Sequence, residues 1–167
     1  MTKFFLLLSF SLLIISCGSE TAKCKYGEPV AIFSDETPDV IKRSFTGNGQ
    51  TAIEEASFKN GMSVEIQQSG CDDILQVFQF RVERPSEGEP NWFLVAGEQF
   101  NYIGNLSEKL EPLLMWGTVI NQNAGGFKYG LPLEVDQGFF IKIDKIESGK
   151  NAILTVELSE NLYPSNF

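Results

Sequence analysis

Apolar and polar residues alternate along several short stretches of the chain. In the segment 62–67 (MSVEIQ) every second side chain is apolar, which is typical of a strand with one buried face. Asn60-Gly61, just before it, predicts a turn. A three-residue loop over 59–61 places Phe58 opposite Met62 and puts Gly61 where a positive φ is needed. The pattern therefore predicts a β-hairpin.

Two further segments are interpreted as strands. Thr51–Phe58 (TAIEEASF) is the expected partner in this hairpin, although its Ala and Glu residues also favour a short helix. Ile74–Glu83 predicts a strand that follows the hairpin, because Phe78, Phe80 and Val82 share one of its faces.

A second hairpin is predicted near the end of the chain. Ile141 and Ile143 alternate with polar residues, and so do Leu154 and Val156. Pairing Ile143 with Leu154 and Ile141 with Val156 buries all four on one face. This register leaves an even loop around Ser148-Gly149, which is a turn signal.

One stretch has a helical period instead. Phe93, Ala96, Phe100 and Ile103 follow one another at spacings of three, four and three residues, which places them on one side of a helix. Pro90 is expected at the first helical position, where a missing N–H costs nothing.

The order of these elements predicts the fold class. A further helical turn or two is expected within 107–120, interrupted by Pro112, and 121–130 is expected to form a loop. Strands on both sides of a helix favour an α+β fold. We expect an antiparallel sheet of about five or six strands with one main helix packed on it, in a single domain over 24–167.

Composition narrows the chemistry. The 167 residues include 22 acidic and 13 basic side chains and no His, and the net charge is −9. A His-based triad, a His-ligated metal and a His proton shuttle are therefore excluded. The acidic charge also argues against nucleic acid as a partner, because binding to phosphates needs a basic surface.

No catalytic residue, metal ligand or cofactor site is predicted. Gly47–Ala52 has the spacing of a dinucleotide-binding turn, but the expected neighbouring strands are antiparallel and no long helix follows. Glu54 and Glu55 would point to opposite faces of a strand and so form no dyad. Asp72-Asp73 fits a turn, with weak calcium binding as the alternative, unsupported by the spacing of a calcium loop.

The start of the chain has the organisation of an export signal. Met1–Lys3 is positively charged, and Phe4–Ile15 is apolar apart from two serines. At about 1.5 Å per residue this stretch reaches roughly 18 Å as a helix, short of the ~30 Å hydrocarbon layer. It therefore fits a signal peptide better than a membrane span.

The residues after this stretch, Ile14-Ile15-Ser16-Cys17, resemble the lipobox of bacterial lipoproteins. The resemblance implies that residues 1–16 are removed, that Cys17 carries a diacylglyceryl group, and that 17–23 is a tether. Gly18 follows the cysteine where an Asp signals inner-membrane retention in some of these proteins, so export to the outer membrane is expected. The alternative is an ordinary secretory signal.

With Cys17 lipidated, two cysteines remain. We expect Cys24 and Cys71 to form a disulfide in the oxidising envelope. The entropy model gives about 4 kcal/mol of stabilisation for a loop of this length. Two free thiols are the alternative.

The predicted loop over 121–130 contains a candidate partner site. Phe127 and Tyr129 flank Lys128 between glycines, and Trp92 and Trp116 are possible additions to such an aromatic surface. The alternative is that the aromatic rings of the loop fold back over the core.

These observations favour an outer-membrane lipoprotein that acts as a non-enzymatic binding or envelope module, one that binds or inhibits a basic protein partner. The alternatives are a hydrolase acting on envelope glycan or peptide and a structural subunit of a lipoprotein complex.

Overall fold

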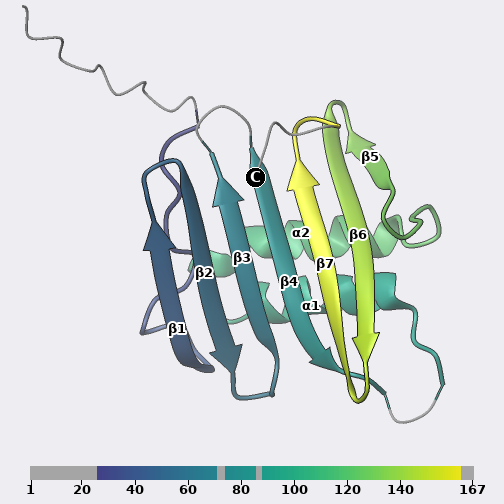
Figure 1. Cartoon of the computed structure of the whole chain (residues 1–167), viewed down its shortest axis with the longest axis horizontal. Coiled ribbons are helices and arrows are strands. Elements are labelled where there is room, and N and C mark those ends of the chain that lie inside the picture. Colours follow the sequence, from purple (N-terminus) through teal and green to yellow (C-terminus); the bar gives the residue numbers. More distant parts are fainter. Residues whose placement is uncertain (1–25, 71–73, 86–87, 163–167) are drawn as a thin grey trace, which may run out of the picture.

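The computed structural model describes residues 26–70, 74–85 and 88–162. Over these residues the chain forms a seven-stranded antiparallel sheet with the strand order β1-β2-β3-β4-β7-β6-β5, and two helices (Figure 1). The strands are β1 (Val40–Gly47), β2 (Thr51–Phe58), β3 (Ser63–Ser69), β4 (Leu75–Glu83), β5 (Pro132–Asp136), β6 (Phe139–Ser148) and β7 (Asn151–Ser159). The α-helices are α1 (Trp92–Gly104) and α2 (Pro112–Gln122), with a short 3-10 helix, Glu108–Leu110, between them.

The α+β prediction with an antiparallel sheet is confirmed, but five or six strands was too few. The two strands without an expected counterpart are β1 and β5, which lie at the two edges of the sheet. Neither buries a full alternating set of side chains: the β1 residues are exposed or half-buried throughout. An edge strand therefore leaves a weak apolar pattern in the sequence.

The first predicted hairpin is confirmed. Thr51–Phe58 is a strand rather than a helix, and the Phe58 N–H donates to the Met62 carbonyl oxygen at 2.9 Å across the three-residue loop. Gly61 has a φ of 87°. Only glycine adopts this conformation without steric cost, so the turn and the register of β2 and β3 follow from one residue.

The second hairpin exists, but its predicted register was wrong by two residues. Ile143 pairs with Val156 and not with Leu154, and Ser148 pairs with Asn151. Gly149 is the first residue of the two-residue loop and has a φ of 59°, as the first central position of a type II′ turn requires. A shift of two residues keeps every side chain on its predicted face.

The predicted helix is α1, although it begins after Pro90. Asn91 is the N-cap residue, and its side-chain oxygen accepts a hydrogen bond from the Phe93 N–H at 3.1 Å. Trp92, the first helical residue, is completely buried. The helical structure expected within 107–120 is present in two pieces, a single 3-10 turn over Glu108–Leu110 and a second helix, α2. Pro112 lies in the first turn of α2, where proline is tolerated, so the helix after it is longer than expected.

The two helices pack closely against each other through glycines. A Cβ atom on Gly117 of α2 would lie 2.8 Å from the carbonyl oxygen of Gly97 on α1 and would collide with the Asn101 side chain. The absence of side chains at both glycines lets the helices approach at this point, so that together they form one layer.

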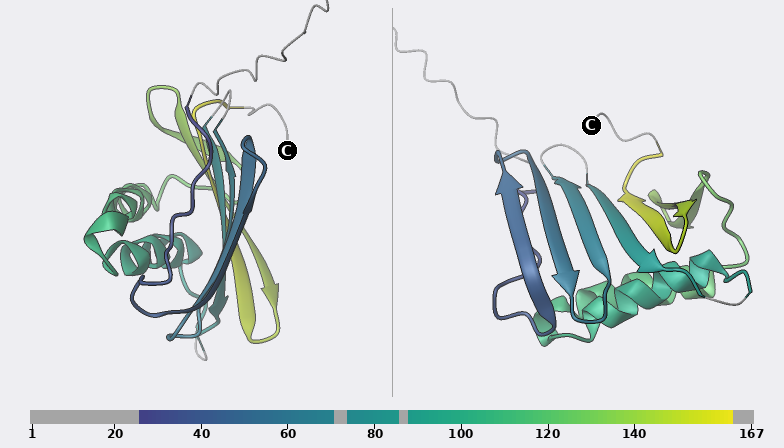
Figure 2. Two further views of the ribbon diagram at one scale, coloured as in Figure 1. Left: turned by 90° about the vertical axis from the view of Figure 1, so that its left-hand side faces the viewer. Right: turned by 60° about the horizontal axis from the view of Figure 1, so that its bottom comes forward.

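Both helices lie on the same face of the sheet (Figure 2). The core between the two layers is aromatic: Phe100 of α1 contacts Phe78 and Phe80 of β4 edge-on, at ring-centroid distances of 4.9 and 5.1 Å. The other face of the sheet is covered by neither helix and carries polar side chains such as Glu55 and Gln79.

A segment before β1 completes the helical layer. Residues 28–35, the N-terminal strap, run along the helix side of the sheet (Figure 2). Phe33 of the strap is 1% exposed and packs edge-on against Phe58 of β2, with ring centroids 5.4 Å apart. Gln68 of β3 donates a hydrogen bond to the Val30 carbonyl oxygen at 3.1 Å.

The strap is held by a buried carboxylate. Glu54 of β2 is 0% exposed, and its two oxygens accept hydrogen bonds from the Ile32 N–H at 2.7 Å and the Phe33 N–H at 2.9 Å. Burial raises the pKa of Glu54, while these two N–H groups and the charges of Arg43 and Lys109 oppose the rise. Glu54 thus anchors irregular backbone to the sheet.

We expect Glu54→Gln to destabilise the fold by about 1–3 kcal/mol, because an amide offers one acceptor oxygen and leaves one buried N–H without a partner. The raised pKa means that the stability contributed by Glu54 is complete below its unfolded pKa and is lost as the pH rises through its folded pKa. The cost of the substitution should therefore be larger at pH 5 than at pH 8. Urea denaturation at both pH values measures it.

Glu55→Gln is the matched control, because the Glu55 side chain is exposed on the bare face of the same strand. We expect it to change the free energy of unfolding by no more than about 0.5 kcal/mol. Equal effects of the two substitutions would show that Glu54 does not hold the strap.

Candidate functional site

A groove of about 540 Å³ opens between α2, the β5–β6 turn and the residues that follow β7. We call it the α2 groove. Its ten lining residues come from these three segments: Met115, Trp116, Val119, Val135, Asp136, Gln137, Gly138, Phe139, Glu160 and Asn161. The volume lies in the range of about 300–1,000 Å³ that is typical of ligand sites.

The apolar part of the groove is built by α2 and the hairpin. Trp116 and Val119, three positions apart, lie on one side of α2. The Trp116 ring stacks on Phe139, the first residue of β6, with centroids 5.0 Å apart and an interplanar angle of 15°. Both rings are half-buried, so part of this aromatic surface faces solvent.

The hairpin turn places polar groups at the rim. Gly138 has a φ of 73°, and its N–H donates to a Glu134 carboxylate oxygen at 3.0 Å. The Gln137 N–H donates to the Asp136 side chain at 2.7 Å. These short-range hydrogen bonds stabilise the turn beside the aromatic pair.

Two carboxylates line the groove, Asp136 from β5 and Glu160 from the end of β7. Within the described part of the chain, neither forms an ion pair with a Lys or Arg. The lining residues include no basic side chain. The groove therefore combines an aromatic surface with negative charge that its own side chains leave uncompensated.

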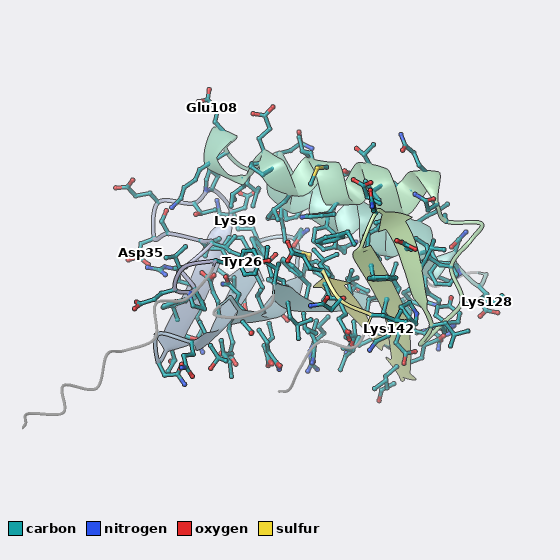
Figure 3. The ribbon with its side chains drawn as sticks, turned by 90° about the horizontal axis from the view of Figure 1, so that it is seen from above. Tyr26, Asp35, Lys59, Glu108, Lys128 and Lys142 are labelled. Atoms are coloured by element: carbon teal, nitrogen blue, oxygen red, sulfur yellow. The ribbon has the colours of Figure 1, made fainter. Side chains whose placement is uncertain are left out.

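The structure separates the residues of the predicted partner loop. Phe127 is only 6% exposed and contacts Phe93 of α1, with ring centroids 5.6 Å apart, so it belongs to the core. Tyr129 stacks on the same Phe93 at 4.5 Å but remains 41% exposed. Lys128 is exposed and lies at the opposite end of the molecule from Asp35 (Figure 3).

A charged cluster adjoins Tyr129. The Lys145 ammonium of β6 lies 5.1 Å from the centre of the Tyr129 ring and 5.7 Å from that of Trp92. It also pairs with Glu147 at 2.6 Å and with Glu89 at 3.4 Å. Hydrogen bonding with Glu147 raises the pKa of Lys145, and the same contact lowers the pKa of Glu147. Both groups therefore stay charged at neutral pH.

The strand geometry shows where the other residues considered for catalysis or nucleotide binding lie. Glu54 is buried and Glu55 exposed, so the prediction that the two side chains point to opposite faces of β2 is confirmed. Gly47 pairs with Ala52 across the β1–β2 hairpin, which is antiparallel, as expected for a turn without a dinucleotide-binding helix. Cys17, Cys24 and Asp72-Asp73 lie outside the described residues.

Cys71 also lies outside them, so the disulfide stays a prediction. Among the described residues, no three Asp, Glu, Cys or His side chains are grouped closely enough to hold a metal ion. No helix in the described ranges has the length and apolar character needed to cross a membrane.

The α2 groove was not predicted from the sequence, although Trp116 was singled out as a possible contact. Trp92, named with it, is buried in the core. The spacing of Trp116 and Val119 was the one local signal. Phe139, Asp136 and Glu160 reach the same groove only through the pairing of β5, β6 and β7.

Comparison with known proteins identifies no relative: no family model, no curated protein and no solved structure matches the chain.

The chain contains two tryptophans, and the structure places them in different environments. We expect acrylamide to quench the fluorescence of Trp116 in the groove and to leave Trp92, which is 0% exposed, largely unquenched. Trp116→Phe should remove the quenchable fraction, whereas Trp92→Phe should retain it. Equal quenching of both single-tryptophan variants would contradict the groove as described.

Proposed function

We propose that this chain is a bacterial lipoprotein, anchored in the outer membrane through Cys17, that acts as a non-enzymatic binding module for a basic protein partner. The observation that carries the binding role is the α2 groove, where the stacked Trp116–Phe139 pair adjoins the Asp136 and Glu160 carboxylates. An aromatic surface with polar groups at its rim is typical of recognition sites.

The anchor is supported by the leader sequence. A short apolar stretch followed by Ile14-Ile15-Ser16-Cys17 provides both the export signal and the cysteine for lipidation. Each buried methylene contributes about 0.8 kcal/mol, so two or three acyl chains hold a protein stably on a membrane. The residues between Cys17 and Tyr26, the first described residue, leave room for a tether.

The basic partner is supported by the charge of the chain. A net charge of −9 repels acidic proteins and raises the rate at which basic ones associate, an effect that falls as salt is added. Lys128 and the exposed ring of Tyr129 form a second candidate contact, separate from the groove.

The anchor predicts a defined covalent change. The protein isolated from membranes should have the mass of residues 17–167 plus a diacylglyceryl group, with or without a further acyl chain. Cys17→Ser should abolish this addition and release the protein from the membrane fraction. Cys24→Ser is the matched control and should keep the lipid; an unmodified Cys17 in the wild type would reject the anchor.

The binding role is tested by crosslinking and affinity purification from native envelope. We expect Trp116→Ala to lose a partner that the wild type retains at low salt and releases at high salt. Phe45→Ala is the matched control, because Phe45 is an aromatic residue that is 36% exposed on the edge strand β1. Tyr129→Ala tests the second contact in the same experiment. Recovery of the same proteins with every variant would reject the proposed function.

A further inference from the structure

The α2 groove and the charged cluster around Lys145, here called the Lys145 cluster, contain the same kinds of chemical group. In the cluster, aromatic rings of Tyr129 and Trp92 and carboxylates of Glu147 and Glu89 surround the ammonium of Lys145. In this cluster the chain's own cations occupy a site of aromatic rings and two carboxylates, since Arg84 also pairs with Glu147 at 3.0 Å.

The α2 groove repeats this set without a cation. Trp116 and Phe139 provide the rings, and Asp136 and Glu160 provide the carboxylates. None of the lining residues is Lys or Arg, and neither carboxylate has an ion-pair partner among the described residues. The nearest basic residue along β6, Lys142, pairs with Glu157 on the opposite face of the sheet. Charge complementarity therefore calls for a cation from outside the chain.

We propose that the α2 groove binds one arginine side chain of the partner, with the guanidinium stacked on the Trp116–Phe139 pair and hydrogen-bonded to Asp136 and Glu160. The inference rests on the proposed binding function and specifies its recognition chemistry. It assigns the negative rim a direct role in the contact, beyond the long-range attraction that the net charge supplies.

Arginine fits this set of groups better than lysine. A guanidinium is planar, so one face stacks on an aromatic ring while the N–H groups at its edge remain free to donate. It binds carboxylates through two parallel hydrogen bonds and is more weakly hydrated than an ammonium. A cation over the face of Trp gains about 0.5–2 kcal/mol, depending on how far water is excluded.

The partial exposure of the α2 groove limits the affinity that we expect for one arginine side chain. Exposed ion pairs contribute only about 0.2–1 kcal/mol each, so the carboxylates alone would select a cation weakly. The aromatic pair adds a contact that requires the side chain to enter the groove. Binding of one arginine should therefore need both kinds of group, and the loss of either should be measurable.

The probe is a capped pentapeptide with one arginine between glycine and serine residues. It is titrated into the full-length chain at low salt while the heat of binding is measured by calorimetry, a readout that the Trp116→Ala variant retains. Two matched peptides replace the arginine by lysine or by citrulline, which has nearly the same shape but no charge. We expect the arginine peptide to bind most tightly, the lysine peptide more weakly, and the citrulline peptide about tenfold more weakly than arginine.

The variants identify the groups involved. Asp136→Asn and Glu160→Gln should each weaken binding of the arginine peptide by roughly two- to fivefold. Glu55→Gln is the matched control: it removes the same charge from the bare face of the sheet and should leave the affinity unchanged. Circular dichroism of each variant confirms that the fold is intact.

The outcomes separate this inference from the proposed function. If arginine and citrulline peptides bind equally and Trp116→Ala abolishes both, the groove recognises neutral chains and the inference fails, while the binding function stands. If no peptide binds, the inference also fails, and capture of the envelope partner decides the function independently. If Glu55→Gln weakens binding as much as Asp136→Asn does, only net charge acts and the inference is overturned.

Discussion

The aromatic contact between Phe100 of α1 and the two phenylalanines of β4 determines where the helices lie on the sheet. Phe78 and Phe80 lie at 4.9 and 5.1 Å from the Phe100 ring, on β4, the central strand of the sheet. Because the face toward Phe100 carries the fully buried aromatic side chains of the sheet, both helices cover the same side. They form one layer there because Gly97 and Gly117 allow them to approach closely.

The N-terminal strap completes this layer. Holding it there costs free energy, because its backbone is irregular and is anchored by a buried carboxylate. Phe58 of β2 is packed between Tyr102 of α1 and Phe33 of the strap, at 5.8 and 5.4 Å. The strap has no ladder of its own, so its buried N–H groups need acceptors from the sheet. Glu54 supplies two oxygens to Ile32 and Phe33, at the expense of burying a carboxylate. A buried acid at this position is thus explained by hydrogen bonding of backbone and needs no catalytic role.

The same arrangement positions the candidate site. Because α2 crosses the sheet above β6, Trp116 meets Phe139 at the end of the β5–β6 hairpin, and Glu160 arrives from β7. The hairpin is held in shape by its own hydrogen bonds, including the one from the Gly138 N–H to Glu134. The groove therefore lies on a helix and a hairpin that pack against the sheet.

The sequence by itself determined the local features: the period of each central strand, the apolar stripe of α1, and the turn at Gly61. Each depends on neighbours a few residues apart. Only the tertiary structure decided that β4 pairs with β7 and that β1 and β5 are the edge strands. It also decided that Trp116, Asp136 and Glu160 line the same groove. Period-two alternation specifies which face of a strand is buried but not which strand lies beside it. Which strand lies beside another depends on how the whole apolar face packs against the helices, and no local segment encodes that packing.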